Sequence, residues 1–183
     1  MSATKVKNSK ADWLEFALDV LVNKGPDALK IEPLCKLKTV SKGSFYHHFK
    51  NRADFIDQLM LHWFEKMTLD FIAQANQQST PLERLEQLDK IISGTNIEAE
   101  LHIRAWALKE PHIGIHLAKI DQQRQQYLKT CSVALGVQPA LAPDVATMAY
   151  SSFLGLQQIH PKPSIETVLR ISAMGSKAFF ENA

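Results

Sequence analysis

Two short helical segments joined by a polar turn occupy residues 31–54, and no other stretch constrains the fold as strongly. In the first segment, apolar residues recur at helical spacing from Ile31, and either Leu37 or Lys38 completes the inner face. Ser41 follows the turn, and serine commonly caps a helix by accepting a hydrogen bond from its first turn. The spacing is typical of a helix-turn-helix.

The second segment has one apolar face and one face suited to a polyanion. Phe45 and Phe49 are four residues apart, so both are expected on the inner side of the helix. On the other side, Gly43 and Ser44 allow the backbone to come close, and neighbouring cations and hydroxyls can contact phosphates. This pattern predicts contact with nucleic acid, and the alternative is an ordinary solvated helix surface.

The run VSKGSFYHHFKNR at residues 40–52 resembles the recognition helix and following linker of tetracycline-repressor (TetR) family transcriptional regulators. The resemblance covers roughly residues 9–57, which is less than a third of the chain. It implies a three-helix helix-turn-helix DNA-binding domain in residues 1–54, with the two-helix motif at about 30–49. A larger helical effector-binding and dimerisation domain is then expected in residues 55–183.

The same resemblance implies a set of contacts to double-stranded operator DNA. Phosphate contacts are implied for Tyr46 and Arg52, whereas Lys42, Ser44 and His47 are expected to approach base edges. A lysine can reach the guanine acceptors of the major groove. The full expected set is Lys36, Lys42, Gly43, Ser44, Tyr46, His47, His48, Lys50 and Arg52.

Capping residues and helix breakers predict an all-α protein of about nine helices, because no segment alternates as a strand should. Ser9 and Asp12 form a capping signal for the first helix, in which Trp13 or Phe16 is expected to meet Phe45. Later helices are expected at 51 to about 77, 81–93, 96–109, 111–135, from 142 onward, and after a capping serine at 164.

The helix from Asn51 to about Gln77 begins with a capping signal, Asn51 followed by Asp54, and keeps a helical period of apolar residues along its whole length. Because it would belong to both expected domains, a shift at its far end can move the recognition helix. We therefore expect this connecting helix to carry a switch.

Two residues depart from the pattern of the resembled family. Cys35 stands where a small alanine is usual, and Thr39 stands where a turn glycine is usual. A threonine with positive φ would be strained, so we expect either a different turn or Thr39 in an ordinary backbone region. Cys35 and Cys131 are far apart in sequence, and both are expected to be buried thiols rather than a disulfide.

Charge is divided unevenly along the chain. Residues 1–54 hold ten Lys or Arg against six Asp or Glu, a net charge of +4, and the remainder carries −2. This division favours a basic module that binds a polyanion. Taken without the helix-turn-helix pattern, the uneven charge could arise by chance. The early lysines Lys5, Lys7 and Lys10 fit either a phosphate-contacting arm or a solvated tail. No apolar run is long enough to span a bilayer, so a cytoplasmic protein without a membrane partner is expected.

His112 and His116 are four residues apart and can share one helix face. This spacing allows metal chelation, but no third histidine or cysteine lies nearby in sequence, so neither a metal site nor a cofactor is expected. Ordinary half-buried histidines and donors in a ligand pocket are the alternatives. The expected effector-pocket residues are Trp63, Met67, His102, Trp106, His112, His116, Tyr127 and Met148, each of which is equally well explained as plain core.

Small residues in the last two expected helices allow close helix packing, and the resembled family dimerises through such a pair. The alternative is packing within one chain. The expected homodimer interface consists of Met148, Ser152, Gly155, Leu156, Val168, Ile171, Ser172, Gly175 and Phe179.

No catalytic motif is present, so an enzyme is not expected. The leading hypothesis is a DNA-binding transcriptional regulator, most simply a repressor that a small molecule releases from a palindromic operator. An activator of the same fold is an alternative. A metal-dependent helical enzyme that uses His112 and His116 is the alternative from a different class.

Overall fold

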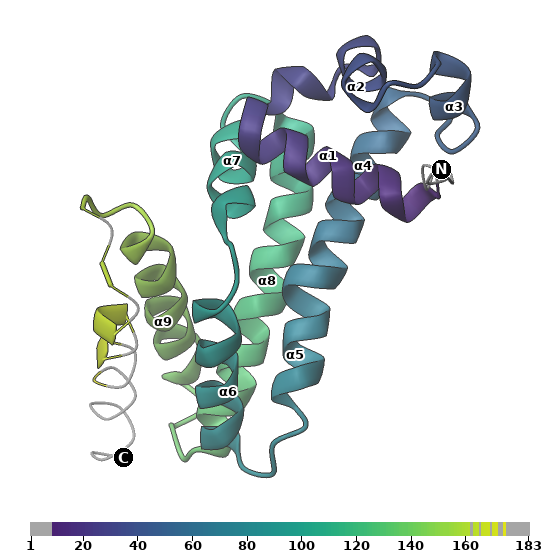
Figure 1. Cartoon of the computed structure of the whole chain (residues 1–183). Helices are drawn as coiled ribbons and strands as arrows, with labels where there is room; N and C mark the ends of the chain where they lie inside the picture. The colour runs from purple at the N-terminus through teal and green to yellow at the C-terminus, as the bar shows by residue number, and fades with distance from the viewer. Residues whose placement is uncertain (1–8, 162, 165, 169, 172–173, 175–183) are drawn as a thin grey trace, which may run out of the picture. The chain divides into compact units, whose positions relative to one another are not determined.

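The computed structural model of the chain describes residues 9–161, 163–164, 166–168, 170–171 and 174, and every regular element in these residues is helical (Figure 1). The all-α prediction is therefore confirmed. The α-helices are α1 (Lys10–Lys24), α2 (Ile31–Lys38), α3 (Lys42–Tyr46), α4 (Arg52–Phe64), α5 (Asp70–Ala75), α6 (Pro81–Ser93), α7 (Glu98–Ala107), α8 (Pro111–Ala134) and α9 (Ala142–Leu156). A 3₁₀ turn, Pro26–Leu29, follows α1, and a π-helical segment, Glu65–Leu69, lies between α4 and α5.

The chain packs into two compact units. The first comprises Met1–Glu65 and Glu98–Leu117, and the second comprises Lys66–Ile97 and Ala118–Ala183. Packing thus places α4 and α7 in the same unit as the helix-turn-helix. The functional division at residues 54 and 55 stays a prediction. No helix in the described part of the chain has the length and apolar character needed to cross a membrane.

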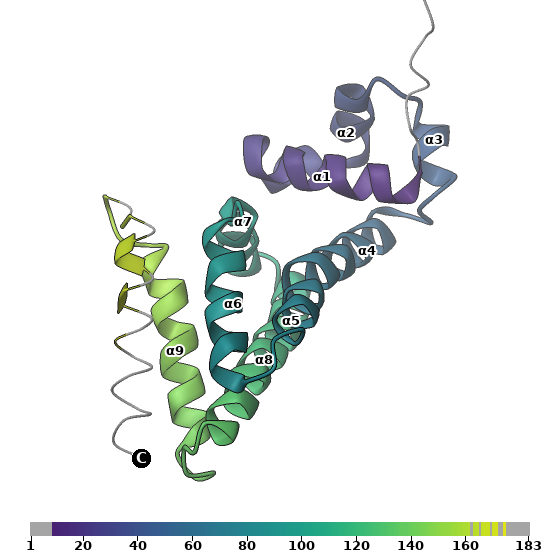
Figure 2. The same cartoon turned by 60° about the horizontal axis from the view of Figure 1, so that its bottom comes forward.

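The first unit is built on α1, which begins where its sequence predicts. The Ser9 hydroxyl accepts a hydrogen bond from the Asp12 backbone N–H, and the Asp12 carboxylate accepts one from the Ser9 N–H. Figure 2 shows α2 and α3 on the same side of α1. Trp13 of α1 meets Phe45 of α3 edge to face, with 5.7 Å between ring centroids, and both side chains are fully buried. The expected contact between the first helix and Phe45 is confirmed.

The inner face of α2 is completed by Lys38 rather than by Leu37. Leu37 is exposed, whereas the Lys38 ammonium lies over the ring of Phe16, 4.7 Å from its centroid, and over that of Trp13 at 5.3 Å. Burial lowers the pKa of Lys38 below its ordinary value. A cation on an aromatic face keeps its charge while its aliphatic stem packs against the core.

The turn between α2 and α3 contradicts the expectation that Thr39 lies in an ordinary backbone region. Thr39 adopts the left-handed conformation, with φ 59° and ψ 44°, and its N–H caps α2 by donating to the carbonyls of Cys35 and Lys36. The cap satisfies carbonyls that have no partner within the helix, which offsets the steric cost of a Cβ in this region. The helix-turn-helix therefore forms with the geometry that a glycine would adopt.

The expected single α-helix from residue 51 to about 77 is interrupted. Asn51 caps α4 by accepting a hydrogen bond from the Asp54 N–H, as predicted, but Glu65–Leu69 forms a π-helix before α5 begins. Thr68 is buried in this segment, whereas Met67 is only half-buried. The constant helical period assumed from the sequence was wrong here, because a π turn adds a residue and shifts the buried stripe.

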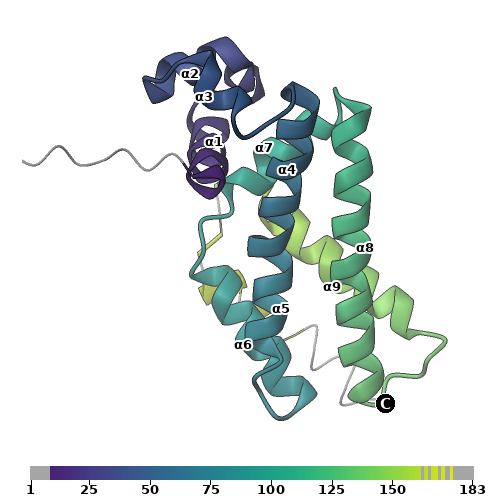
Figure 3. The same ribbon diagram turned by 90° about the vertical axis from the view of Figure 1, so that its right-hand side faces the viewer.

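In the second unit, α5 packs against α6 (Figure 3). Helix α6 starts with a capping box formed by Thr80 and Glu83, with Pro81 at its first position. Cys131 on α8 is buried, as is Cys35 in the first unit, and both are free thiols, which confirms the sequence prediction. Beyond α9, the Ser164 hydroxyl accepts a hydrogen bond from the Thr167 N–H, as expected for a helix cap.

Candidate nucleic-acid interface

Helix α3 presents a polar face above a buried aromatic base. Ser41 caps it by accepting a hydrogen bond from the Ser44 N–H, and Phe45 and Phe49 are buried beneath it. An added Cβ at Gly43 would meet only the Ser41 hydroxyl, at 3.5 Å, so the fold itself has room for alanine there. An exposed glycine that packing does not require is consistent with close approach by an external molecule.

Aromatic and imidazole side chains extend this face past the end of α3. Tyr46 is 54% exposed, and its ring stands edge-on to that of Phe45 at 5.5 Å. His47 is exposed, and its ring lies 4.8 Å from that of the half-buried His48, which in turn contacts Phe49. These contacts hold the side chains against the core without hiding Tyr46 or His47.

Lys42, expected to read bases, is already paired within the chain. Its ammonium lies 3.0 Å from the carboxylate of Glu32 on α2. The hydrogen bond to Glu32, followed by the attraction of its charge, raises the pKa of Lys42. Sequence reasoning missed Glu32, since nothing in its spacing from Lys42 marks the two residues as partners.

Two of the predicted phosphate-contacting residues, Lys50 and Arg52, lie where α4 begins. The Asp54 carboxylate accepts a hydrogen bond from the Lys50 N–H at 2.8 Å, and this bond, followed by one from Gln58, lowers the pKa of Asp54. Arg52 is half-buried, and its guanidinium lies 3.8 Å from the Glu110 carboxylate. Lys50 is exposed, as is Lys36 on α2. The nine expected DNA contacts stay a prediction, and the structure leaves most of them accessible.

The residues expected to line an effector pocket are distributed over both units. Trp63 and Trp106 are core side chains of the first unit, and His102 is half-buried there. In the second unit, Met67 is half-buried and Met148 is 48% exposed.

Tyr127 is held within the second unit. Its hydroxyl donates a hydrogen bond to the Asn76 side chain at 2.9 Å. Burial, followed by interaction with Cys131, raises the pKa of Tyr127 to about 12.

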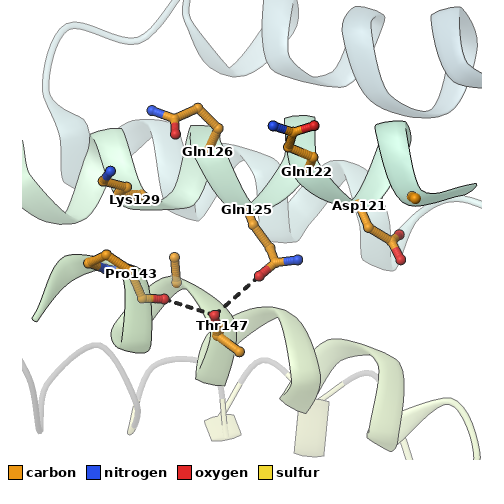
Figure 4. Close-up of a pocket in the computed structure, with 9 residues that line it drawn as sticks. Asp121, Gln122, Gln125, Gln126, Lys129, Pro143 and Thr147 are labelled. Atoms are coloured by element: carbon orange, nitrogen blue, oxygen red, sulfur yellow. Dashed lines mark hydrogen bonds between the residues drawn. The ribbon is translucent and has the colours of Figure 1, made fainter.

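A hollow of about 360 Å³ lies between α8 and α9 in the second unit (Figure 4). The Thr147 hydroxyl donates a hydrogen bond to the Gln125 side chain at its edge. None of the eight expected pocket residues lines it. Its lining is Ala118, Asp121, Gln122, Gln125, Gln126, Lys129, Pro143, Ala146 and Thr147.

A hydrogen-bond network in the second unit joins α8 to the π-helical segment and to α9. The Arg124 guanidinium donates to the Thr68 hydroxyl at 2.8 Å, the Met67 carbonyl at 3.3 Å and the Tyr150 hydroxyl at 3.2 Å. Tyr150 donates in turn to Asp121 at 2.7 Å. A π turn changes the partners of nearby carbonyls, and Arg124 bonds one of them.

His112 and His116 lie side by side in the first unit with a partner that the sequence did not indicate. Their Nε2 atoms are 2.6 and 2.7 Å from the same oxygen, Oδ1 of Asp57 on α4. Burial raises the pKa of the Asp57 carboxyl, but hydrogen bonds from His116 and His112 outweigh it and hold the pKa below its ordinary value. Asp57 and His112 are 55 positions apart, so local spacing gives no signal of their contact.

The described part of the expected dimer surface lies on α9 and just beyond it. Met148, Ser152 and Gly155 are exposed at positions that share one helix face, opposite the buried Ala146 and Tyr150. Three of the predicted residues, Ser172, Gly175 and Phe179, lie outside the described residues, as do the early lysines Lys5 and Lys7. The remaining three, Leu156, Val168 and Ile171, are half-buried.

Comparison with known proteins gives matches to one family of bacterial regulators. A family model described as bacterial regulatory proteins, tetR family, matches residues 14–59. The HTH-type transcriptional repressor KstR2 of Mycobacterium tuberculosis is 24% identical over 86 residues, 47% of this chain and 43% of that protein. Residues 14–59 therefore match the pattern of the tetR family in the region of the helix-turn-helix.

Solved structures of transcriptional regulators share this helical fold. A putative transcriptional regulator from Saccharomonospora viridis in complex with choline superposes with TM-score 0.74 at 16% identity, covering 90% of this chain and 93% of that one. A TetR-family transcriptional regulator from Streptomyces coelicolor gives TM-score 0.77 at 13% identity, covering 96% and 90%. The chain spans less than half the length of its curated relative KstR2. These comparisons lend no support to the helical-enzyme alternative.

Proposed function

We propose that this TetR-family chain is a DNA-binding transcriptional regulator, not an enzyme, and that it binds operator DNA as a homodimer under the control of a small molecule. The observation that carries the proposal is the exposed face of α3, where Lys42, Tyr46 and His47 stand over a rigid aromatic base. The match to the tetR family model covers this whole region. A cytoplasmic location goes with this function.

The DNA contacts divide into those that hold phosphates and those that read bases. Tyr46→Phe and Arg52→Ala remove phosphate contacts, so they should weaken binding to every sequence alike. Lys42→Ala should also relax the preference at one base step. Fluorescence anisotropy with operator and scrambled duplexes measures both effects, with the exposed Lys119→Ala on α8 as the matched control. A uniform loss for Lys42→Ala would remove its base-reading role.

Salt dependence measures the number of phosphate contacts. With about six to eight charge contacts per dimer, log K should fall against log salt with a slope of about −5 to −7. Arg52→Ala should make this slope less steep by about one for each half-site affected. A slope near zero would contradict the assignment of this face to DNA.

Dimerisation is proposed through the exposed face of α9. An added Cβ at Gly155 meets nothing within 4 Å in the described part of the chain, so a larger side chain can start there unless a partner occupies the space. We expect the native chain, 20.6 kDa by itself, to run as a dimer of about 41 kDa in light scattering. Gly155→Trp should shift it toward monomer, whereas the control Gln123→Trp on α8 should not. A native monomer at micromolar concentration would contradict this interface.

The effector is proposed to act by favouring one spacing of the two recognition helices over another. A ligand changes DNA affinity only through a difference in its own affinity for the two states, and the effect is reciprocal. Choline, bound by the Saccharomonospora viridis relative, is a first compound to test. Titration with and without operator decides the matter: equal affinities would show that the tested compound is not the inducer.

Repression is proposed as the regulatory sign, since the curated relative is named as a repressor. An operator that overlaps the promoter would support it. Reporter transcription that falls when the chain is deleted would instead indicate an activator.

A further inference from the structure

Asp57, His112 and His116 bring three potential metal-ligand atoms to one place in the first unit. The two imidazole Nε2 atoms and the carboxylate oxygen all lie within 4.8 Å of one another. The histidines are one turn apart on α8, and Asp57 projects from α4. We propose that these three side chains bind one first-row divalent transition-metal ion.

The distances are close to those of a metal site. Zinc lies about 2.0–2.2 Å from imidazole nitrogen and carboxylate oxygen, which places neighbouring ligand atoms about 3.3 Å apart in a tetrahedral arrangement. Here the two N–O distances are 2.6 and 2.7 Å. An entering ion therefore needs each N–O pair to open by about 0.6 Å, which is a small change for partly exposed side chains.

The donor chemistry selects the class of ion. Two imidazoles and one carboxylate suit Zn²⁺, Co²⁺, Ni²⁺ or Fe²⁺, whereas Mg²⁺ and Ca²⁺ prefer sites made wholly of oxygen. In the ion-free form each ring donates an Nε2–H to the Asp57 carboxylate. When an ion binds, each neutral ring takes the Nδ1–H tautomer, so that Nε2 offers its lone pair to the metal.

Exposure supports a site with open coordination positions. The side chain of His112 is 51% exposed and that of Asp57 is 46% exposed, so water and ions reach the cluster directly. His116 is 23% exposed and anchors the cluster from the protein side. Three protein ligands leave one or more positions for water, in contrast to a closed structural zinc site.

The same three residues could serve only as a hydrogen-bonded bridge between α4 and α8, and a metal titration separates the two roles. We expect the full-length, tag-free chain to bind one Zn²⁺ per chain in isothermal titration calorimetry, with a Kd of about 1 µM or tighter. Co²⁺ should give visible absorption bands from the bound ion. Addition of Mg²⁺ should displace neither Zn²⁺ nor Co²⁺ from the site.

Ligand variants test which residues hold the ion. Asp57→Asn, His112→Gln and His116→Gln should each weaken Zn²⁺ binding by at least about tenfold and reduce the Co²⁺ bands. His160→Gln, an exposed histidine outside the cluster, is the matched control and should bind as the native chain does. Circular dichroism checks that each variant keeps its helical fold. His112 is the most exposed of the three side chains, so its replacement should disturb the fold least.

The contrary outcomes are specific. Absence of Zn²⁺ binding at 100 µM, or binding left unchanged by His112→Gln, would overturn the site and leave the hydrogen-bonded bridge. Equal binding of Mg²⁺ and Zn²⁺ would overturn the assigned class of ion. None of these results depends on whether the chain binds DNA.

Discussion

The helix-turn-helix rests on an apolar base, whereas the second unit is held in part by a polar network. Beneath α3, Phe45 packs against three other buried rings, those of Trp13, Phe49 and Phe55, at centroid distances of 5.1–5.7 Å. In the second unit, Arg124 instead joins three segments by hydrogen bonds. Close-packed rings fix a surface but offer nothing for a ligand to replace, while hydrogen bonds can be exchanged for those of a ligand.

This contrast suits the two proposed tasks. A recognition surface must keep its side chains in a constant arrangement, so a base with little freedom is an advantage. A unit that responds to a small molecule needs contacts with two discrete arrangements. The contrast can be tested by removing each kind of support.

The largest expected effect is the loss of the aromatic base. Phe45→Ala should lower the free energy of unfolding by about 3–5 kcal/mol, because the cavity lies at the centre of the ring cluster. Chemical denaturation followed by circular dichroism measures it. Leu61→Ala, which truncates a 52% exposed side chain on α4, should cost less than about 1 kcal/mol. Similar costs for the two variants would show that the base is not tightly packed.

Removal of the polar support should cost less. Arg124→Met keeps the length of the side chain but leaves the buried Thr68 hydroxyl without this donor, so we expect a loss of about 1–3 kcal/mol. Lys119→Met on the exposed side of α8 is the control and should change stability little. If Arg124→Met instead raised the free energy of unfolding, the Arg124 network would not be a source of stability.

The turn above the aromatic base should gain stability from a glycine. Thr39→Gly removes the Cβ that is disfavoured at φ 59°, so we expect stabilisation of up to about 1 kcal/mol. Lys36→Gly, inside α2, should instead destabilise by about 1 kcal/mol. Both are measured by denaturant midpoint. Destabilisation by Thr39→Gly would mean that the threonine side chain makes a contribution that outweighs its backbone strain.

The smallest effect is expected at the surface of the recognition helix. Glu32→Gln removes the ion pair that holds Lys42, so operator affinity should rise about two- to fivefold. Glu86→Gln on α6 removes the same charge far from α3 in sequence and is the control for net charge. A fall in affinity would show that Glu32 positions Lys42 for DNA instead of competing for it.

Local signals predicted the parts of the first unit that depend on local chemistry. Ser9, Ser41 and Asn51 cap helices where their spacing indicated, and Phe45 is buried as its period required. The left-handed conformation of Thr39 was not predicted, because the cap that its N–H gives to α2 outweighs the preference of threonine for negative φ.

Local signals could not predict contacts between side chains that lie on different helices. Asp57 meets His112 and His116 only because α4 and α8 pack together, and Glu32 meets Lys42 only because of the turn between them. The polar hollow between α8 and α9 has no sequence signature, since its lining comes from residues spread over two helices. Prediction of these features needs the packing itself.

The π turn at Glu65–Leu69 amounts to an inserted residue within an otherwise regular helix. The buried side chain after Trp63 is Thr68, five positions later, where an α-helix would bury the third or fourth. A one-residue insertion between Trp63 and Thr68 would make Thr68 the sixth residue after Trp63 and turn it by about 100° off the buried stripe. Its hydroxyl would then lose Arg124. Length changes at these five positions should therefore be far less tolerated than substitutions.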